Sequence, residues 1–254
     1  MIVWNAKHFD GRDERVLWGC EPMVCYTYWW FWPTQDLYLT WPVPWDRFAA
    51  KCKEVQDRGV RAVLLQIEGW PNDIRKVSDG EVEQTMERLM EIGSQASHAA
   101  PLVEFGWYST GTFPIVSGYK HLADQAWYDA NIRLLRTRDE AGRYSAADPW
   151  RGTHFACPSL YAHHGLATPD AWIANAEPNL HVAAWIDRPV RPAISPEWHP
   201  CAGELLPIDY WRAVLAFCHD QHVQPVLWAS NKTIDAARAE GAEWLDALRE
   251  HTGP

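Results

Sequence analysis

A short apolar run in the chain ends in two polar side chains of the kind that catalyse reactions. Residues 62–68 read Ala-Val-Leu-Leu-Gln-Ile-Glu. In a strand the side chains alternate between two faces, so Leu64, Gln66 and Glu68 share one face, and the opposite face carries Val63, Leu65 and Ile67. Burying an amide and a carboxylate costs free energy unless a role or a partner compensates. Glu68 is therefore a candidate general acid and Gln66 a candidate for orienting a substrate; an internal ion pair of Glu68 is the alternative.

The run at residues 103–108, Val-Glu-Phe-Gly-Trp-Tyr, shows a similar pattern. By the same alternation Glu104, Gly106 and Tyr108 share a face. Gly106 leaves room there for a ligand or a close backbone. Tyr108, at the end of the run, is a candidate for a hydrogen bond to a substrate, and Glu104 is expected to lie deeper as a structural partner.

Three further polar residues, Tyr161, Asp187 and Glu197, each end an apolar run. Asp187 and Glu197 are the candidates for a second carboxylate that would act with Glu68. The alternative for both is that they anchor loops through an ion pair or a helix cap. Tyr161 is a candidate substrate contact.

Tryptophan is unusually abundant, with 17 residues beside 9 tyrosines and 7 phenylalanines. Some of these rings must belong to the core. Flat indole rings also stack on sugars, and their N–H group fixes orientation, so the composition favours a carbohydrate ligand. The candidate sugar platforms are Trp70, Trp107, Trp198 and Trp228. Trp107 is the weakest of them, because its alternation turns it away from Tyr108.

Strand-like runs alternate with helical patterns along the chain. Strands are expected at residues 23–30, 62–68, 102–108, 155–161, 181–187, 192–197 and 223–228, with an eighth at 15–19. Helices are expected at residues 46–58, at 119–134, 170–176, 208–218 and 233–249, and from 79 onward after a capping box formed by Ser78 and Glu81.

Strands separated by helices imply parallel pairing through right-handed crossovers. The length of 254 residues fits one TIM-type (β/α)8 barrel, irregular and with seven or eight strands, as a single domain over residues 1–254. The alternative, a doubly wound sheet, usually has a Gly-rich phosphate turn, which this sequence lacks. In a barrel the active site lies at the carboxyl ends of the strands, which is where the candidate residues stand.

Charge and hydropathy exclude several classes of function. The net charge is -10, from 23 basic and 33 acidic residues, so nucleic-acid binding is not expected. No apolar run approaches the roughly 20 residues that cross a bilayer. The first residues lack the pattern of a secretory signal, so we expect a cytoplasmic protein or one exported without a recognisable signal peptide.

Metal and cofactor motifs are missing from the sequence. The six cysteines form no Cys-x-x-Cys pair, and the eleven histidines supply no His-x-His after the first expected strand. We therefore expect free thiols, no metal and no other cofactor. No Gly-x-Ser-x-Gly elbow of a serine hydrolase is present.

Two pieces of the chain resemble hyaluronidase-like glycoside hydrolases of (β/α) barrel fold. Residues 65–71, Leu-Gln-Ile-Glu-Gly-Trp-Pro, are similar to the strand-end Asp-x-Glu segment of that family, which is closely followed by Trp and Pro. Residues 196–199, Pro-Glu-Trp-His, together with 226–228, Val-Leu-Trp, are similar to its last strands, which end in a Trp beside the sugar.

The resemblance implies a retaining hydrolysis in which the substrate's own N-acetyl group attacks the anomeric carbon. Glu68 would protonate the leaving oxygen, and the residue at position 66 would orient the acetamide. Gln66 departs from the family's Asp and carries no negative charge, so it would position the acetamide through hydrogen bonds alone. A similar amide, Asn before x-Glu, occurs in another group of endo-N-acetylglucosaminidases.

The sequence thus predicts a glycosidase acting on a polysaccharide or glycan, with an N-acetylhexosamine-containing substrate favoured by the resemblance. The expected partner is a carbohydrate, and the oligomeric state is left open. A non-catalytic carbohydrate-binding or structural barrel is the alternative that Gln66 favours. A polysaccharide lyase would instead use Tyr108 or Tyr161 as a base.

Overall fold

The computed structural model describes residues 1–2, 4–7, 20–27, 31–37, 40–67, 78–109, 153–184, 188–240 and 242–252. Seven strands in these ranges form one sheet in the order β5-β4-β3-β2-β1-β7-β6, and every neighbouring pair is parallel. The strands are β1 (Trp4–Lys7), β2 (Glu21–Thr27), β3 (Ala62–Gln66), β4 (Glu104–Ser109), β5 (Phe155–Pro158), β6 (Ala193–Ile194) and β7 (Val226–Leu227).

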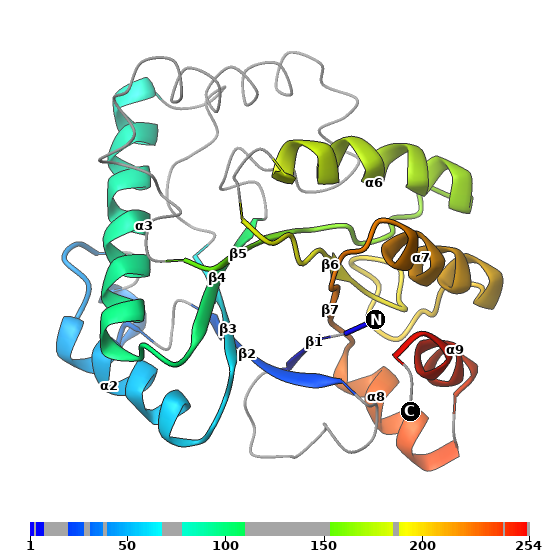
Figure 1. Ribbon diagram of the computed structural model, residues 1–254, viewed down its shortest axis with the longest axis horizontal. Coiled ribbons are helices and arrows are strands. Elements are labelled where there is room, and N and C mark those ends of the chain that lie inside the picture. The colour runs from blue at the N-terminus through cyan, green and yellow to red at the C-terminus, as the bar shows by residue number, and fades with distance from the viewer. Residues whose placement is uncertain are drawn as a thin grey trace.

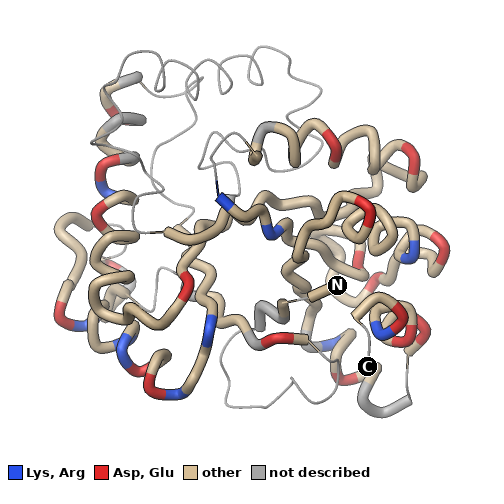
Figure 2. The backbone as a smooth tube through the Cα atoms, in the orientation of Figure 1, with Lys and Arg blue, Asp and Glu red and all other residues tan. Residues whose placement is uncertain are grey.

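Helices flank the strands on two sides. Figure 1 shows α2 and α3 along one side and α6 to α9 along the other. Their bounds are α2 (Trp45–Asp57), α3 (Asp79–Ala99), α6 (Pro169–Ala184), α7 (Ile208–Asp220), α8 (Asn231–Glu240) and α9 (Glu243–Thr252), with a short 3-10 helix, η2 (Gln35–Leu37). Many of the charged residues lie on these helices, and others lie on the strands and connecting segments (Figure 2).

The capping box at the start of α3 is confirmed. The backbone N–H of Ser78 donates to Oε2 of Glu81 at 2.8 Å, and the N–H of Glu81 donates to Oγ of Ser78 at 3.4 Å. These bonds satisfy two of the amide groups that a helix start leaves without partners. The 3–4-residue spacing of Leu89, Ile92 and Ala96 then buries one face of α3.

One expected strand is wrong. Residues 181–184, the start of the strand expected at 181–187, are the last turn of α6. This helix runs from Pro169 to Ala184 and so extends beyond the short helix expected at 170–176. The buried residues Trp172, Ala176, Leu180 and Ala183 recur every three to four positions, as a helix requires. A short apolar run cannot by itself distinguish a buried strand from a helix turn. Pro178 lies within α6, and proline in a sequence usually indicates the end of a helix.

Two other differences concern the ends of the chain. The tetrapeptide Trp-Asn-Ala-Lys at 4–7 was not expected to be a strand, yet β1 pairs with both β2 and β7 and joins the two halves of the sheet. The helix expected at 233–249 is two helices, α8 and α9. The elements expected at 15–19 and 119–134 lie outside the described residues.

The two edge strands of the sheet, β5 and β6, are linked to each other. Isolated parallel bridges join Ala156 to Val190 and Ser159 to Ala193. The amide of Arg191 donates to the carbonyl of Ala156 at 2.8 Å, and the amide of Leu160 donates to the carbonyl of Ala193 at 2.8 Å. Backbone hydrogen bonds therefore connect residues of or next to the two edge strands.

One hydrophobic cluster, which we call the interior cluster, takes side chains from all seven strands. Its buried members are Trp4, Met23, Cys25, Ala62, Leu64, Tyr108, Phe155, Cys157, Tyr161, Ala193 and Val226, with Trp228 packed against them. The alternate residues of the same strands belong to two other clusters, which include the helices. On β3, for example, Leu64 lies in the interior cluster and Val63 and Leu65 pack with α2 and α3, as the alternation predicted.

The amino ends of the strands surround a buried guanidinium. Arg191 is 6% exposed, and its Cζ lies 4.5 Å from the ring centre of Trp4 and 4.4 Å from that of Phe155. Its Nη2 donates to Oε2 of Glu104, the first residue of β4. Ring faces attract a cation, and the carboxylate of Glu104 compensates its charge. The Arg191 side chain can therefore be buried next to Trp4 and Phe155 of the interior cluster. Glu104 is thus the structural partner that the sequence predicted.

We expect the two halves of this ion pair to differ in their effect on stability. Glu104→Ala leaves a buried guanidinium without its carboxylate and should lower the free energy of unfolding by about 3 kcal/mol. Arg191→Met keeps the volume and leaves a carboxylate that is 45% exposed and can be hydrated, so its cost should be smaller. Urea unfolding of both variants and of the double variant measures the difference. A larger loss in Arg191→Met would contradict this account.

Gly106 has a packing role in β4. The sequence suggested that it leaves room for a ligand or a close backbone, but the ring of Phe155 occupies the space that a side chain would need. The two residues are register partners on β4 and β5. The space beside Gly106 is therefore filled by a core side chain of the interior cluster and is not open to a ligand.

Gly106→Ala should lower the free energy of unfolding by about 1–3 kcal/mol, because the added methyl group overlaps an aromatic ring held in a packed core. The matched control is Gly80→Ala in α3, where a methyl group meets no atom within 4 Å and the helix gains backbone restraint. Thermal unfolding of both variants compares them. Equal melting temperatures would show that Phe155 can move aside.

Candidate functional site

Gln66 stands at the carboxyl end of β3 and faces the interior cluster. Its Oε1 accepts a hydrogen bond from the thiol of Cys25, a member of that cluster, at 3.2 Å. The orientation is the one that the alternation along residues 62–68 predicted. An amide is thus held at the end of the strand that leads directly to Glu68 in the sequence.

Tyr108, Tyr161 and Trp228 form an aromatic group at the same end of the interior cluster. The ring centres of Tyr108 and Tyr161 are 6.3 Å apart, and those of Tyr161 and Trp228 are 6.1 Å apart. The hydroxyl of Tyr108 donates to Oγ of Ser159 at 3.4 Å. These residues follow or end β4, β5 and β7, so the fold brings together three candidates that are far apart in the sequence.

Tyr161 is neutral in this setting. Burial raises its pKa well above the usual tyrosine value, and the neighbouring Tyr108 adds to the effect. Burial likewise raises the pKa of the Cys157 thiol well above its ordinary value. A phenol with a raised pKa donates a hydrogen bond but is a poor base at neutral pH. This disfavours a lyase that would use the Tyr161 phenolate.

Glu197 is held in a network that starts a helix. It is 2% exposed, and its Oε1 accepts hydrogen bonds from the amide of Ser230 at 2.9 Å and from its hydroxyl at 2.7 Å. The hydroxyl of Ser230 accepts in turn from the amide of Thr233 in the first turn of α8. The loop-anchoring role that the sequence left open for Glu197 is therefore present. Its Oε2 has no partner among the described residues.

Two of the proposed sugar platforms are core residues. Trp107 is 1% exposed and packs in the cluster that includes α2 and α3. Trp198 is 9% exposed and packs among the residues of α6 to α9. One of its faces stacks on His164 with ring centres 4.8 Å apart, and Tyr210 meets it edge-on at 5.2 Å. Burial of Trp107 and the ring contacts of Trp198 thus place both tryptophans in packed clusters, and their role toward a sugar stays a prediction.

Three candidates lie outside the described residues: Glu68, Trp70 and Asp187. Their roles stay predictions.

Other residues join the site that the sequence did not single out. Cys25 and Ser159 hydrogen-bond Gln66 and Tyr108, and His199 stacks on Tyr161 with ring centres 5.0 Å apart. Alternation along β5 and its continuation could have found Ser159, because it shares a face with Tyr161. His199 lies in a loop, and no local pattern indicated its contact.

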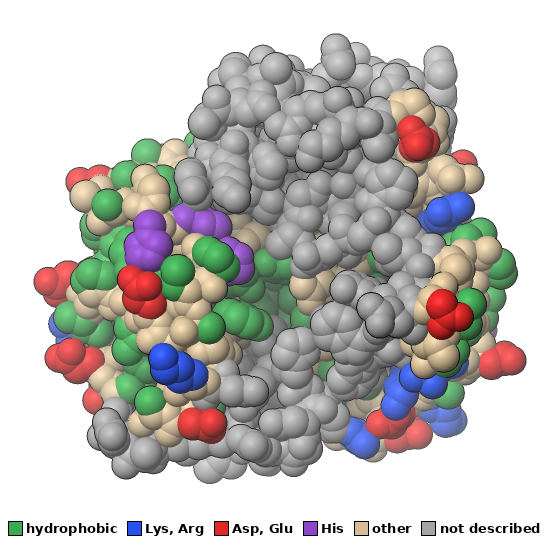
Figure 3. All heavy atoms as spheres, turned by 180° about the vertical axis from the view of Figure 1, so that it is seen from behind, with side chains coloured by type: hydrophobic (Ala, Val, Ile, Leu, Met, Phe, Trp, Pro, Cys, Tyr) green, Lys and Arg blue, Asp and Glu red, His purple; other side chains and the backbone are tan. Residues whose placement is uncertain are grey.

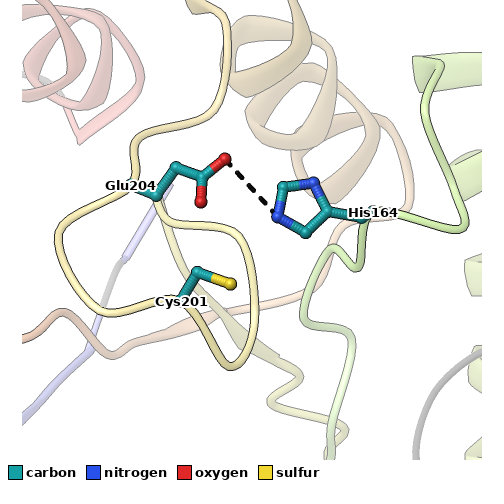
Figure 4. A group of neighbouring side chains, drawn as sticks. All are labelled: His164, Cys201 and Glu204. Atoms are coloured by element: carbon teal, nitrogen blue, oxygen red, sulfur yellow. Dashed lines mark ion pairs between the residues drawn. The ribbon is translucent and has the colours of Figure 1, made fainter.

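One group of possible metal ligands occurs in the described part of the chain. The ligand atoms of His164, Cys201 and Glu204 all lie within 4.8 Å of one another (Figure 4). The three residues belong to the loops after β5 and β6. On the face seen in Figure 3, histidine side chains gather beside hydrophobic ones.

Among the described helices, none is long and apolar enough to cross a membrane.

Comparison with solved structures identifies the fold. The structure is similar to bee venom hyaluronidase, with a TM-score of 0.64 and 12% sequence identity over 97% of this chain and 98% of that one. The fold is hyaluronidase-like. A second structure of bee venom hyaluronidase, in complex with a hyaluronic acid tetramer, gives a TM-score of 0.57 and 13% identity over 80% of this chain and 74% of that one. No family model and no curated protein matches the sequence. The resemblance suggested by residues 65–71 and 226–228 is thus confirmed in the fold.

We expect Glu197→Ala to lower the free energy of unfolding by about 1–3 kcal/mol, because the partly buried amide and hydroxyl of Ser230 lose their shared acceptor. Glu177→Ala, an exposed position on α6, is the control and should change stability by no more than about 0.5 kcal/mol. Urea unfolding measures both. An unchanged stability in Glu197→Ala would mean that the contact with Ser230 does not anchor α8.

Proposed function

We propose that this protein is a glycoside hydrolase that acts on a polysaccharide or glycan, with Glu68 as the general acid. One observation carries the proposal: Gln66 faces the interior at the carboxyl end of β3, where Tyr108, Tyr161 and Trp228 gather. Catalytic groups of barrel enzymes lie at this end of the strands. Glu68 follows Gln66 by two residues and, in a continued strand, would share its face.

The proposal includes closure of the sheet into a barrel of the (β/α)8 type. A flat sheet of seven strands would be roughly 29 Å wide at about 4.8 Å per strand, so its edges could not meet. The bridges from Ala156 to Val190 and from Ser159 to Ala193, with an interior cluster that draws on every strand, support closure.

We further propose that the substrate contains N-acetylhexosamine. Its acetamide oxygen would attack the anomeric carbon while Glu68 gives a proton to the departing glycosidic oxygen, and water would then open the cyclic intermediate. Gln66 can hold an acetamide by hydrogen bonds, and the neutral phenol of Tyr161 can donate one. Oε1 of Glu197 already accepts two hydrogen bonds from Ser230 and the residue is 2% exposed, so a nucleophile supplied by the substrate fits this site better than a second acid from Glu197.

Indole and phenol rings would supply the binding surface. Trp228 is partly exposed beside Tyr161 and offers a flat face at the carboxyl end of β7. Aromatic surroundings also exclude water, and burial of this kind raises the pKa of a carboxyl group. A raised pKa would keep Glu68 protonated, as a general acid needs to be, at a higher pH than an exposed glutamate.

The decisive experiment measures turnover of labelled oligosaccharides with and without N-acetylhexosamine. Glu68→Gln should lower the rate by about 10²–10⁴, the usual contribution of a general acid, while binding persists. Glu243→Gln, an exposed position on α9, is the matched control and should keep full activity. Turnover that is equal in Glu68→Gln and the native protein would overturn the assignment.

A non-catalytic carbohydrate-binding barrel is the second candidate, and the neutral side chain of Gln66 favours it. Binding of the same oligosaccharides by the native protein with no turnover would support it. Products that absorb in the ultraviolet through a new double bond would instead identify a lyase.

A further inference from the structure

An imidazole, a thiol and a carboxylate meet between the loops that follow β5 and β6. Nε2 of His164 lies 3.4 Å from Oε1 of Glu204, and the ligand atoms of both residues lie within 4.8 Å of the Cys201 thiol (Figure 4). We propose that His164, Cys201 and Glu204 form a zinc-binding site that clamps the two loops together. This proposal does not rest on the glycosidase assignment, because none of the three residues is among the candidate catalytic or sugar-binding residues and Cys201 packs against the cluster that includes α6 to α9.

The distances suit a tetrahedral zinc ion. Zn–N and Zn–O bonds of about 2.1 Å at a tetrahedral angle place the two ligand atoms about 3.4 Å apart. The His164–Glu204 separation already has this value. A Zn–S bond of about 2.3 Å places the sulfur about 3.6 Å from the other ligands, so the Cys201 thiol, now within 4.8 Å of both, needs to move by on the order of 1 Å.

The backbone prepares two of the ligands. The amide of Glu204 donates to the carbonyl of Cys201 at 3.0 Å, which closes a four-residue turn, and Gly203 has a φ of +83°. A positive φ at the third position is the signature of a type II turn, in which the first and fourth residues lie close together. The amide of Trp198 also donates to the carbonyl of Glu204 at 2.9 Å. Cys201 and Glu204 therefore occupy fixed neighbouring positions.

The third ligand is oriented independently. The His164 ring stacks on Trp198 with an interplanar angle of 21°, and the amide of Leu166 donates to the carbonyl of His163 at 2.8 Å. The amide of His199 donates to the carbonyl of Ala162 at 2.7 Å and ties the two loops together. The imidazole thus faces Glu204 from a loop whose position does not depend on their ion pair.

Cys201 is the thiol suited to this role. It is partly exposed, and the other five cysteines are buried. Burial raises the pKa of Cys20, Cys52 and Cys218 to about 12, so these thiols stay neutral and unreactive. A thiolate at Cys201 with the Glu204 carboxylate would neutralise a dication, and the three side chains leave a fourth position for water.

The test titrates metal-free protein with Zn²⁺ by calorimetry and with Co²⁺ by absorption spectroscopy. We expect one ion per chain, and a thiolate-to-cobalt charge-transfer band that disappears in Cys201→Ser. His164→Ala and Glu204→Gln should each weaken Zn²⁺ binding by at least about tenfold, since loss of even an outer-shell partner costs that much. The matched controls on α6, His181→Ala and Glu177→Gln, should bind as the native protein does.

A second measurement needs no variant of the ligands. A thiol reagent should modify one cysteine per native chain rapidly, and Zn²⁺ should slow that reaction by at least about tenfold, because a coordinated thiolate is not free to attack. Modification that Zn²⁺ does not slow, no binding at one ion per chain, or equal affinity in the variants would each overturn the proposal and leave an ion pair with a bystander thiol only.

Discussion

The packing of the interior cluster depends on one contact, that of the Arg191 guanidinium with the rings of Trp4 and Phe155. A buried cation is tolerable only when its charge is compensated, and Glu104 supplies the carboxylate. The contact involves β1, β4 and β5 and the segment leading into β6, including the edges of the sheet. Filling the amino end of the interior in this way leaves the carboxyl end as the place where polar side chains can meet a ligand.

The interior changes in character from one end to the other. Near Arg191, the ring of Phe155 fills the space over Gly106, and small and aliphatic side chains such as Ala62 and Leu64 pack the middle. At the carboxyl end the side chains are an amide, two phenols and an indole. Such a gradient confines hydrogen-bonding groups to one end and surrounds them with rings, which suits a ligand that carries both apolar faces and hydroxyl groups.

The loops at this end are braced by contacts of their own. Glu197 fixes Ser230 at the start of α8, and His199 packs on Tyr161 while its amide holds the neighbouring loop. The His164, Cys201 and Glu204 group lies between the same two loops. Rigid loops matter to a site of this kind because side chains that act on a substrate must be held within a fraction of an ångström of their working geometry.

The sequence alone determined the local features. Alternation predicted which sides of β3 and β4 face inward, including Gln66 and Tyr108, and helical spacing and the capping box predicted the start of α3. These follow from backbone geometry, which repeats over a few residues and leaves its period in the pattern of apolar side chains.

The tertiary structure decided what depends on distant partners. Only the fold shows that Trp4–Lys7 is a strand between β2 and β7, that residues 181–184 end a helix, and that Trp198 packs beneath His164. Contacts between residues far apart in the chain leave no periodic trace, because they depend on the path of the whole backbone. For that reason the sequence could name Tyr161 and Trp228 as candidates, but only the tertiary structure shows that their rings lie 6.1 Å apart.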